Sequence, residues 1–565
     1  MAQLGDVYGR MVRPSQYHHD GGDLRSHWKS NNPRLRRSNI QLAGLCFRPF
    51  ERATEATKPV PLRAATCRVF SEPALDIIWS DQNGLGHLVE CLPSDLWTIS
   101  DDTTPGTLTL RRPPRTITQQ DWVRFDTYAR RVRKLSFGPP KSSLRSRTMS
   151  ADVFHWLSSS RPSHQLLPNL RRLYWSDDMR PGCYDYFHMF LGPRLCTLRL
   201  SEPPPQFTTS HRAILSALDR LPQIAPGIEV LSVWENQCEG LDPRPIPGHV
   251  CTLWRRLWSL RLGLSLTMTY DAFAGLSALP MLAEAALSLA GPFDANCSTR
   301  NYTFPAMQTL DLTSETMADI RAVLSSCHFP GLRRMSLTSQ SGPKADLLNR
   351  VLEAIHERIP HASLVYLKLH AGNTMDVGEI VNAASLRSLY DFHHLVYFDF
   401  VMGIRIALTD DDIKEMAMSW PRIKHLALCS NASKDAVQQT WTIDPRPWTT
   451  KPTLEGLVDL ARYCPSLELL ALDADTSGAE AYLEVHPGGG HCCPTLRVIR
   501  LVSPPLSTIK QIAAFLCAVF PSVWFLNDTD CTEVGDTWQR VLRAVDVLRG
   551  TVYEDEDEED EEDEE

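Results

Sequence analysis

The stretch PGLRRMSL, residues 330–337, is one of many near-copies of an eight-residue pattern. PAMQTLDL (305–312) precedes it, and PRIKHLAL (421–428), PSLELLAL (465–472) and PTLRVIRL (494–501) follow. The pattern is proline, any residue, an apolar residue, two free positions, an apolar residue, one free position and an apolar residue. Its first apolar residue falls at Leu170, Leu195, Ile228, Leu257, Leu282, Met307, Leu332, Leu364, Leu395, Ile423, Leu467 and Leu496, with a weaker copy at Val523. Such recurrence indicates a repeat architecture.

Each copy predicts a short strand, because its last two apolar positions alternate with polar ones. Helix-period segments such as KADLLNRVLEAIHERI (344–359) and TDDDIKEMAMSW (409–420) lie between the copies. We expect Ser314 and Thr409 to act as N-caps, with the carboxylates that follow Thr409 suiting the helix dipole. The proline ends each helix and restarts the strand. The fold class is therefore α/β, with repeated strand–helix units.

This spacing resembles that of the leucine-rich-repeat family over residues 168–530. The resemblance implies a curved solenoid with short parallel strands inside and helices outside, which we assign to residues 168–550. The family's asparagine, three positions after the last apolar residue, is present only at Asn236 and Asn431, so the backbone ladder must be made by other groups. A (βα)8 barrel is the structural alternative, but a dozen units exceed the eight that close a barrel.

Composition and hydropathy predict a soluble intracellular protein of the cytoplasm, the nucleus or both. The first residues contain no continuous apolar run, and no stretch reaches the roughly 18 apolar residues that a membrane span needs. Apart from the adjacent Cys492 and Cys493, the 15 cysteines are scattered singly, as expected for reduced thiols.

The two ends of the chain carry opposite charge. The formal net charge is −9, but all twelve residues of 554–565 are acidic, and without them the charge is +3. We expect residues 551–565 to be a disordered acidic tail and residues 1–45, with seven Lys or Arg, to be a disordered basic arm. Aromatic interleaving and nucleic-acid-binding motifs are missing from the arm, so the sequence does not predict nucleic-acid binding.

A helical pattern follows at residues 61–97. Within it, LRAATCRVFSEPALDIIW resembles the second half of an F-box, and the continuation resembles the connector of the large fungal F-box and leucine-rich-repeat family, with an entry repeat at Val132, Leu135 and Phe137. We assign 46–97 to a small F-box-like helical segment and 98–167 to the connector and entry repeat. The residues that match the F-box pattern are Leu62, Cys67, Arg68, Phe70, Ala74, Leu75 and Trp79.

The resemblance implies a substrate-recognition subunit of a cullin-RING ubiquitin ligase, with a Skp-type adaptor, a cullin and an unknown protein substrate as partners. Residues 40–61 do not match the first half of the F-box pattern. Two alternatives follow. The chain is a ligase-independent binding scaffold, or the helical segment simply caps the first repeat.

The free strand positions identify a candidate binding groove. If the apolar positions face the core, the free ones face the inner surface, and in the later repeats they are aromatic or apolar. We expect a protein partner to contact Tyr366, Lys368, Tyr397, Asp399, His425, Leu469 and Val498. The alternative is that the insertion at 429–453, with Trp441 and Trp448, covers this surface.

The sequence predicts no enzyme activity, metal or cofactor. HPGGGHCCPTL (486–496) lacks the Lys-Ser/Thr of a phosphate-binding loop. His491, Cys492 and Cys493 are metal-capable, but no second pair at ligand spacing accompanies them. No nucleophile elbow, kinase signature or dinucleotide fingerprint appears.

Overall fold

The structure is a computed structural model in two compact units, Met1–Ile228 and Glu229–Glu565, which are considered separately. The boundary lies inside the predicted solenoid segment. The basic arm, the acidic tail and residues 46–67 of the F-box-like segment lie outside the described residues. The described residues are 68–100, 107–110, 118–137, 149, 151–161, 165–175, 184–201, 208–234, 244–246, 248–263, 266–291, 293, 301–373, 380–429, 451–472, 474–476, 487–501, 509–526 and 532–550.

The first unit contains a parallel ladder in the order β1, β4, β5, β6 and an antiparallel pair, β2 and β3. Its described elements, in chain order, are α3 (Arg68–Ser80), β1 (Asp81–Asn83), α4 (Gly86–Val89), β2 (Trp97–Ser100), β3 (Thr107–Leu110), α5 (Gln119–Ala129), β4 (Lys134–Phe137), α6 (Ala151–Ser160), β5 (Arg172–Trp175), η3 (Tyr184–Phe190), β6 (Thr197–Ser201) and α7 (Thr208–Ile224).

An aromatic cluster fills the core of the first unit behind β4 and β5. The ring centroids of Phe137 and Trp175 are 4.4 Å apart, and Phe154 and Phe190 lie 5.8 and 5.6 Å from Trp175. All four rings are buried. Because Phe137 and Trp175 are register partners in parallel strands, the strand pairing itself brings the two rings together.

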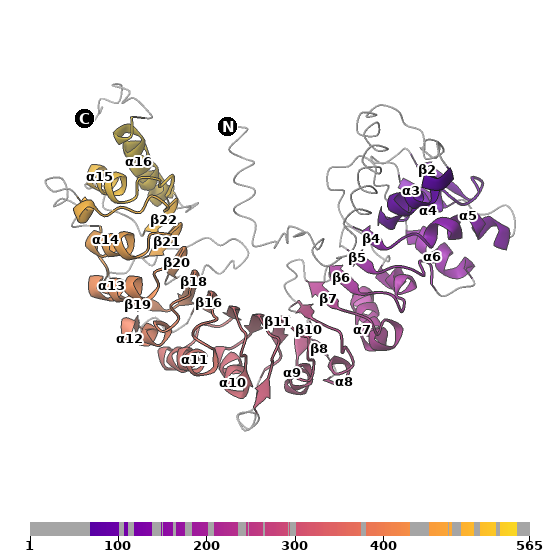
Figure 1. Ribbon diagram of the computed structural model, residues 1–565, viewed down its shortest axis with the longest axis horizontal. Coiled ribbons are helices and arrows are strands. Elements are labelled where there is room, and N and C mark those ends of the chain that lie inside the picture. The colour runs from indigo at the N-terminus through magenta and orange to yellow at the C-terminus, as the bar shows by residue number, and fades with distance from the viewer. Residues whose placement is uncertain are drawn as a thin grey trace, which may run out of the picture. The chain divides into compact units, whose positions relative to one another are not determined.

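The second unit contains one long parallel ladder in the order β7, β9, β11, β13, β15, β16, β18, β20, β21, β22, β23. Within this unit the strands lie on the inner side and the helices on the outer side (Figure 1). The described residues thus confirm the predicted α/β class and form a leucine-rich-repeat-like array of strands and helices.

The described elements of the second unit, in chain order, are β7 (Val230–Trp234), β8 (Arg244–Ile246), α8 (Gly248–Cys251), β9 (Ser259–Leu262), β10 (Leu266–Met268), α9 (Tyr270–Leu276), β11 (Glu284–Leu289), β12 (Tyr302–Thr303), β13 (Thr309–Ser314), α10 (Met317–Ser326), β14 (Cys327–His328), β15 (Arg334–Ser339), α11 (Ala345–Arg358), β16 (Tyr366–Asn373), β17 (Ile380–Asn382), α12 (Ala383–Leu386), η5 (Arg387–Leu389), β18 (Tyr397–Gly403), β19 (Arg405–Ala407), α13 (Asp410–Ser419), β20 (His425–Cys429), α14 (Leu454–Tyr463), β21 (Leu469–Leu472), η7 (Pro487–Gly490), β22 (Val498–Leu501), α15 (Ile509–Val519), β23 (Phe525–Leu526) and α16 (Thr532–Leu548). None of the described helices has the length and apolar character needed to cross a membrane.

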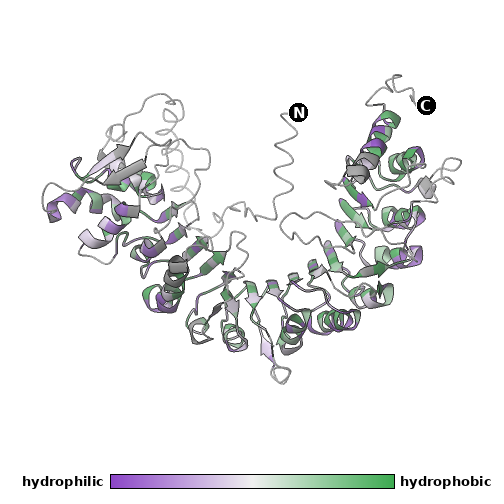
Figure 2. Cartoon of the chain, turned by 180° about the vertical axis from the view of Figure 1, so that it is seen from behind, coloured by the Kyte–Doolittle hydropathy of each residue, from purple (hydrophilic) through white to green (hydrophobic). Residues whose placement is uncertain are grey.

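The core lies between the strands and the helices. In the repeat that begins at residue 330, Leu332, Met335 and Leu337 are completely buried, whereas Arg334 and Ser336 are half-buried on the opposite face of β15. Three such side chains per repeat contribute roughly 1.5 to 3 kcal/mol each before conformational entropy is counted. Hydrophilic and hydrophobic residues alternate along the helices, as expected for helices with one buried face (Figure 2).

A buried carboxylate ties one repeat to the preceding one. Asp319 of α10 accepts hydrogen bonds from the backbone N–H of Phe293 at 2.9 Å, from the Thr316 hydroxyl at 2.6 Å and from the Ser314 hydroxyl at 3.2 Å. The N-cap of α10 is Thr316, so the expectation for Ser314 was wrong. Ser314 is still the last residue of β13, and its hydroxyl is bonded to Asp319 instead of capping the helix.

Other side chains make similar links between neighbouring repeats. The Ser363 and Thr495 hydroxyls donate to the carbonyls of Leu332 and Leu467 at 2.7 and 2.9 Å. Asp410, at the start of α13, accepts from the backbone N–H of Thr453 at 2.7 Å. These bonds link neighbouring repeats through backbone groups at positions other than those of a regular asparagine ladder.

The predicted N-terminal cap of α13 is confirmed. Thr409 is the N-cap and forms a capping box with Asp412. The Asp412 carboxylate accepts from the Thr409 backbone N–H at 2.9 Å, and the Asp412 N–H donates to the Thr409 hydroxyl oxygen at 3.3 Å. Asp410 and Asp411 also lie in the first turn, where carboxylates are favourable for the helix dipole.

We expect Asp319→Ala to lower the free energy of unfolding by roughly 1 to 3 kcal/mol, because the buried N–H of Phe293 loses its acceptor. Urea unfolding followed by circular dichroism measures this. Asp346→Ala is the control: that carboxylate is exposed, lies in the first turn of α11 and pairs with Arg350 one turn away, so a loss of at most about 1 kcal/mol is expected. Equal losses in the two variants would contradict a linking role for Asp319.

A candidate protein-binding face

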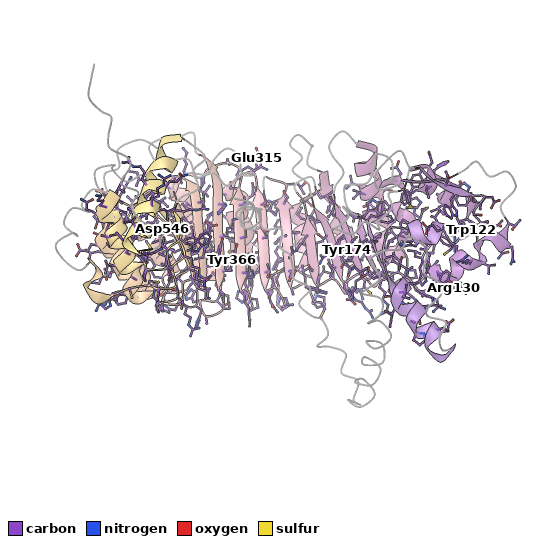
Figure 3. The ribbon with its side chains drawn as sticks, turned by 90° about the horizontal axis from the view of Figure 1, so that it is seen from above. Trp122, Arg130, Tyr174, Glu315, Tyr366 and Asp546 are labelled. Atoms are coloured by element: carbon purple, nitrogen blue, oxygen red, sulfur yellow. The ribbon has the colours of Figure 1, made fainter. Side chains whose placement is uncertain are left out.

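The strand register of the second unit aligns the free positions of successive repeats in two rows. In the first row, each of the following residues is the register partner of the next: Ser259, Glu284, Thr309, Arg334, Tyr366, Tyr397, His425, Leu469 and Val498. In the second row they are Arg261, Ala286, Asp311, Ser336, Lys368, Asp399, Ala427, Ala471 and Arg500. The structure therefore brings together all seven residues of the predicted groove. Figure 3 shows the strands side by side from above, with Tyr366 labelled among them.

The centre of the first row is a continuous stack of planar groups. The ring centroids of Tyr366 and Tyr397 are 4.1 Å apart, those of Tyr397 and His425 are 4.0 Å apart, and both pairs are inclined by only 14°. The Arg334 guanidinium lies over the Tyr366 ring at 4.2 Å. Parallel strands are spaced at about 4.8 Å, close to the separation at which rings stack. We call these four residues the aromatic stack.

A buried carboxylate lies beside the aromatic stack in the second row. The Asp399 side chain is only 9% exposed, and its Oδ2 lies 3.0 Å from Nε2 of His370. The Tyr397 hydroxyl donates to the same oxygen at 3.3 Å. The other oxygen, Oδ1, is buried without a hydrogen-bond partner among the described residues. A donor group of a partner reaches this acceptor only if a side chain that covers it moves aside.

The charges around Asp399 keep it ionised. Burial alone would raise the pKa of Asp399, but the His370 imidazole and the Lys368 ammonium outweigh burial and lower it. Asp311, two strands away, shows the opposite balance: burial raises its pKa in spite of the Ser336 hydroxyl and nearby cations. Of the two carboxylates, Asp399 is therefore the one held in its charged form.

Two rings of the aromatic stack are held neutral. Burial lowers the pKa of His425 from 6.5 to about 4; Asp399 opposes this shift, and Arg500 and Lys368 add to it. Burial and the charge of Asp399 raise the pKa of Tyr397. At neutral pH the stack therefore contains an uncharged imidazole and a protonated phenol that can donate to Asp399.

The two ends of the face differ in character. At the β9–β11 end, charge is paired internally: Arg261 lies 3.4 Å from Glu284, which also accepts from the Ser259 hydroxyl at 3.0 Å. At the other end, Leu469 and Val498 are half-buried and continue the row beyond His425. The aromatic stack lies between a polar end and an aliphatic end. Residues 430–450 of the predicted covering insertion, including Trp441 and Trp448, lie outside the described residues.

The predicted adaptor-docking residues are only partly described. Leu62 and Cys67 lie outside the described residues, and Arg68 and Phe70 belong to α3 but their side chains are not described. Ala74, Leu75 and Trp79 are half-buried residues of α3. The Trp79 ring stacks on Tyr128 of α5 at a centroid distance of 4.4 Å, so Trp79 packs within the unit.

The outward face of α3 carries a pair that the sequence reasoning did not select. Ile77 and Ile78 are 56% and 44% exposed, whereas Arg131 pairs with Glu72 and Asp76 and holds the helix beside α5. Two adjacent isoleucines next to Trp79 were the available signal. Their exposure, together with the packing of Trp79 on Tyr128, shows that the isoleucines face away from α5.

The metal-capable residues of the glycine-rich turn do not gather. Cys493 is buried, with its thiol near the carbonyls of Cys464 and Leu467, whereas His491 and Cys492 are exposed. Among the described residues, three metal-capable side chains do meet at another place, His356, His361 and Asp391. His356 and His361 are five residues apart, a spacing that the sequence shows, but Asp391 lies 35 residues from His356, so only the fold adds the third group.

Comparison with known proteins does not assign this chain to a family. No family model matches the chain, and no curated protein matches its sequence. Among solved structures, an internalin of Listeria monocytogenes is 12% identical over 69% of this chain and 92% of its own, with a TM-score of 0.33. The Arabidopsis receptor kinase HAESA, solved with the peptide hormone IDA and the co-receptor SERK1, is 14% identical over 76% of this chain, with a TM-score of 0.32.

The plant peptide hormone receptor RGFR1, solved with RGF2, is 12% identical over 74% of this chain, with a TM-score of 0.28. This chain spans 63% of the length of each of the two receptor chains. Likenesses of this size carry no argument about family or function, so the functional conclusion depends on the geometry of the face itself.

The depressed pKa of His425 gives a pH prediction. Between about pH 6.5 and pH 4, His425 is protonated in the unfolded chain but stays neutral in the folded chain. The free energy of unfolding therefore decreases as the pH falls through this range. We expect His425→Phe, which keeps a stacked ring, to remove up to roughly 3 kcal/mol of that loss. Urea unfolding at pH 7, 5.5 and 4.5 measures it, and parallel pH curves for the two proteins would contradict it.

Proposed function

We propose that this chain is a protein-binding scaffold, and that its partner binds to the inner face of the second unit. The binding patch consists of Tyr366, Lys368, Tyr397, Asp399, His425, Leu469 and Val498. The observation that carries the proposal is the uninterrupted aromatic stack beside a buried, ionised carboxylate with one unsatisfied oxygen. Such a combination supports recognition better than it supports the stability of the free chain.

The rigidity of the aromatic stack favours binding. Tyr366, Tyr397 and His425 are held by one another and by the strands beneath them, so little side-chain entropy remains to be lost when a partner docks. Tyrosine and arginine are also the residues that most often dominate the binding energy of protein interfaces. The half-buried Leu469 and Val498 offer apolar contact at one end of the same row.

The chemistry of the partner follows from Asp399. A group that satisfies Oδ1 must donate a hydrogen bond, and a positively charged donor gains most from an ionised carboxylate. We infer that the partner presents an arginine or lysine to Asp399 and an apolar side chain to Leu469 and Val498. The Lys368 ammonium near Asp399 limits how many positive charges the patch accepts.

A displayed library of random peptides, selected on the immobilised full-length protein, tests the proposal. Selected peptides should be enriched in arginine or lysine together with apolar residues, and Asp399→Asn should weaken their binding at least about tenfold, because the variant loses the charge but keeps the side-chain shape. Fluorescence anisotropy of the selected peptides measures the affinities.

Two further variants make this result interpretable. Tyr366→Ala removes the ring between Arg334 and Tyr397 and should also weaken peptide binding, whereas Asp346→Asn on the outer helix α11 should not. Circular dichroism verifies that each variant is folded. If the selected peptides bind Asp399→Asn, Tyr366→Ala and the wild-type protein equally well, the binding surface lies elsewhere.

A second candidate function is the substrate-recognition role in a cullin-RING ubiquitin ligase, with a Skp-type adaptor docked on the F-box-like segment. It is favoured by the resemblance of residues 62–79 to an F-box and by the exposed pair Ile77 and Ile78 on α3. In this role the binding patch holds a substrate. The chain then raises the local concentration of substrate lysines near the ubiquitin-carrying enzyme.

A pull-down with purified Skp adaptor and cullin separates this role from a ligase-independent scaffold. We expect the wild-type protein to recover the adaptor, and the double variant Ile77→Asp with Ile78→Asp to lose at least about nine-tenths of the recovery, because two charges would be buried at the interface. Met281→Asp, at an equally exposed methionine of the second unit, is the matched control. No recovery by the folded wild-type protein would rule out the ligase role.

A further inference from the structure

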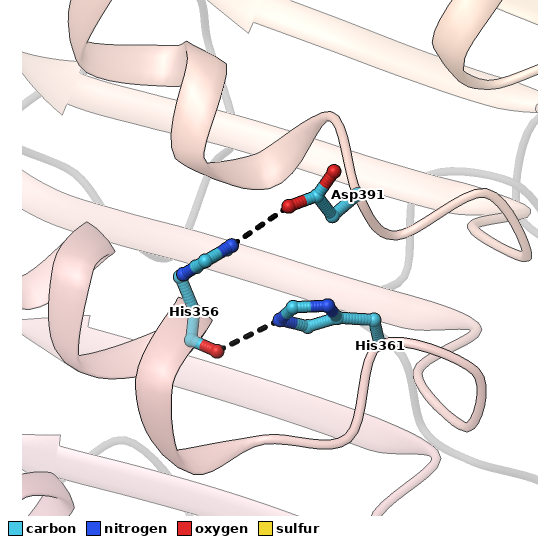
Figure 4. Close-up of side chains that lie close together, drawn as sticks. All are labelled: His356, His361 and Asp391. Carbon is cyan, nitrogen blue, oxygen red and sulfur yellow. Dashed lines mark hydrogen bonds and ion pairs between the residues drawn. The ribbon is translucent and has the colours of Figure 1, made fainter.

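Three metal-capable side chains meet on the outer side of the second unit, where two consecutive repeats adjoin. His356 lies in the last turn of α11, His361 follows in the loop that leads to β16, and Asp391 lies in the loop between η5 and β18. One candidate ligand atom from each residue lies within 4.8 Å of the other two. Figure 4 shows the three side chains converging from the helix and the two loops.

The hydrogen bond of His361 determines its tautomer. Nε2 of His361 lies 2.9 Å from the backbone carbonyl oxygen of His356. A carbonyl oxygen only accepts, so Nε2 must carry the proton, and Nδ1 of the neutral ring then has a free lone pair. In Figure 4 this second nitrogen lies on the edge of the ring that faces Asp391. Donation of the other ring N–H to a carbonyl is the arrangement that orients metal-binding histidines.

The other two groups form a pair that already approaches the spacing of two ligands. Nε2 of His356 lies 2.8 Å from Oδ2 of Asp391. Because a carboxylate only accepts, Nε2 of His356 carries the proton of this hydrogen bond, and a metal ion must displace that proton to bind there. The Asp391 side chain is 58% exposed and the His356 side chain 35%, so both can rotate, and an ion can enter from solvent.

The position of His361 is fixed by its neighbours. Its ring lies 4.5 Å from the His356 ring and packs edge-to-face on Phe392 at 4.9 Å. Phe392 is completely buried and directly follows Asp391. The contact between His361 and Phe392 therefore fixes the position of the His361 ring relative to the backbone at Asp391.

We propose that His356, His361 and Asp391 form a Zn²⁺ site that joins α11 to the following repeat. Two imidazoles and one carboxylate are ligands that Zn²⁺ accepts, with water completing the tetrahedron. Bonds of about 2.0 to 2.1 Å place the ligand atoms roughly 3.3 Å apart, a spacing that rotation of the two exposed side chains supplies. The site is independent of the binding patch, and its role is to link two repeats.

Zn²⁺ titration of the full-length protein against a chromophoric chelator tests the site. The other histidines and the cysteines of the chain also bind metal, so the decisive quantity is the difference between variants. We expect His361→Ala to lose one Zn²⁺ equivalent, or to bind it at least about tenfold more weakly than the wild-type protein. Asp391→Asn should show the same loss with a smaller change in shape.

His393→Ala is the matched control, because His393 is exposed and lies two residues from Asp391, but its Nδ1 contacts the Ser419 carbonyl at 3.0 Å. It should retain the equivalent that the other variants lose. A second readout is the melting temperature, which Zn²⁺ should raise more in the wild-type protein and the His393 variant than in His361→Ala.

Co²⁺ absorption identifies the ligands, since nitrogen and oxygen ligands give no thiolate charge-transfer band. The proposal is overturned if all four proteins bind Zn²⁺ with the same stoichiometry and affinity. It is also overturned if the equivalent lost in His361→Ala shows thiolate absorption in the wild-type protein. Circular dichroism of each variant separates the loss of a ligand from the loss of the fold.

Discussion

The parallel hydrogen-bond ladder of the second unit, with one register kept from strand to strand, is the constraint on which the other features depend. Because Arg334, Tyr366, Tyr397 and His425 are successive register partners, their side chains must leave the sheet one above the other at the strand spacing. The core obeys the same rule on the opposite face, where Leu337 and Leu369 are register partners. A shift of one residue in any strand would exchange the two faces.

This constraint explains why the binding patch contains both stacked rings and a buried charge. A planar side chain at a given position in neighbouring repeats can stack without any further adjustment, so three such repeats give an extended neutral surface. The next free position along the strand, that of Asp399, lies beside the stacked rings, which shield it from water. Asp399 is therefore buried by its neighbours, and the cost of its desolvation is reduced by His370 and the Tyr397 hydroxyl. One of its oxygens is buried without a hydrogen-bond partner among the described residues.

Much of this arrangement could be predicted from the sequence, because a repeat spaces its own positions. Counting from the first apolar residue of each copy predicted the strands, their buried and free positions and the alignment of Tyr366, Tyr397 and His425. Spacing could not reveal the links that depend on loops. Asp319 reaches back 26 residues to Phe293, and the distance from His356 to Asp391 depends on how two connections fold. The sequence also could not show that Thr316 and not Ser314 is the N-cap of α10, because this depends on where β13 ends. The side chains at the beginning of the F-box-like match lie outside the described residues, and the outward direction of Ile77 became evident only from the packing of Trp79.

The most direct test of this account is disulfide trapping of the strand register. Thr309→Cys with Arg334→Cys joins register partners of β13 and β15, whose Cα atoms are about 4.8 Å apart, within the range of about 4.4 to 6.8 Å that disulfides span. Thr309→Cys with Ser336→Cys is displaced by two residues, which places the Cα atoms about 8 Å apart. Peptide mapping by mass spectrometry under mild oxidation distinguishes the new bond from the native cysteines. We expect efficient cross-linking of the first pair and little of the second. Preferential cross-linking of the displaced pair would contradict the register and, with it, the aromatic stack and the binding patch.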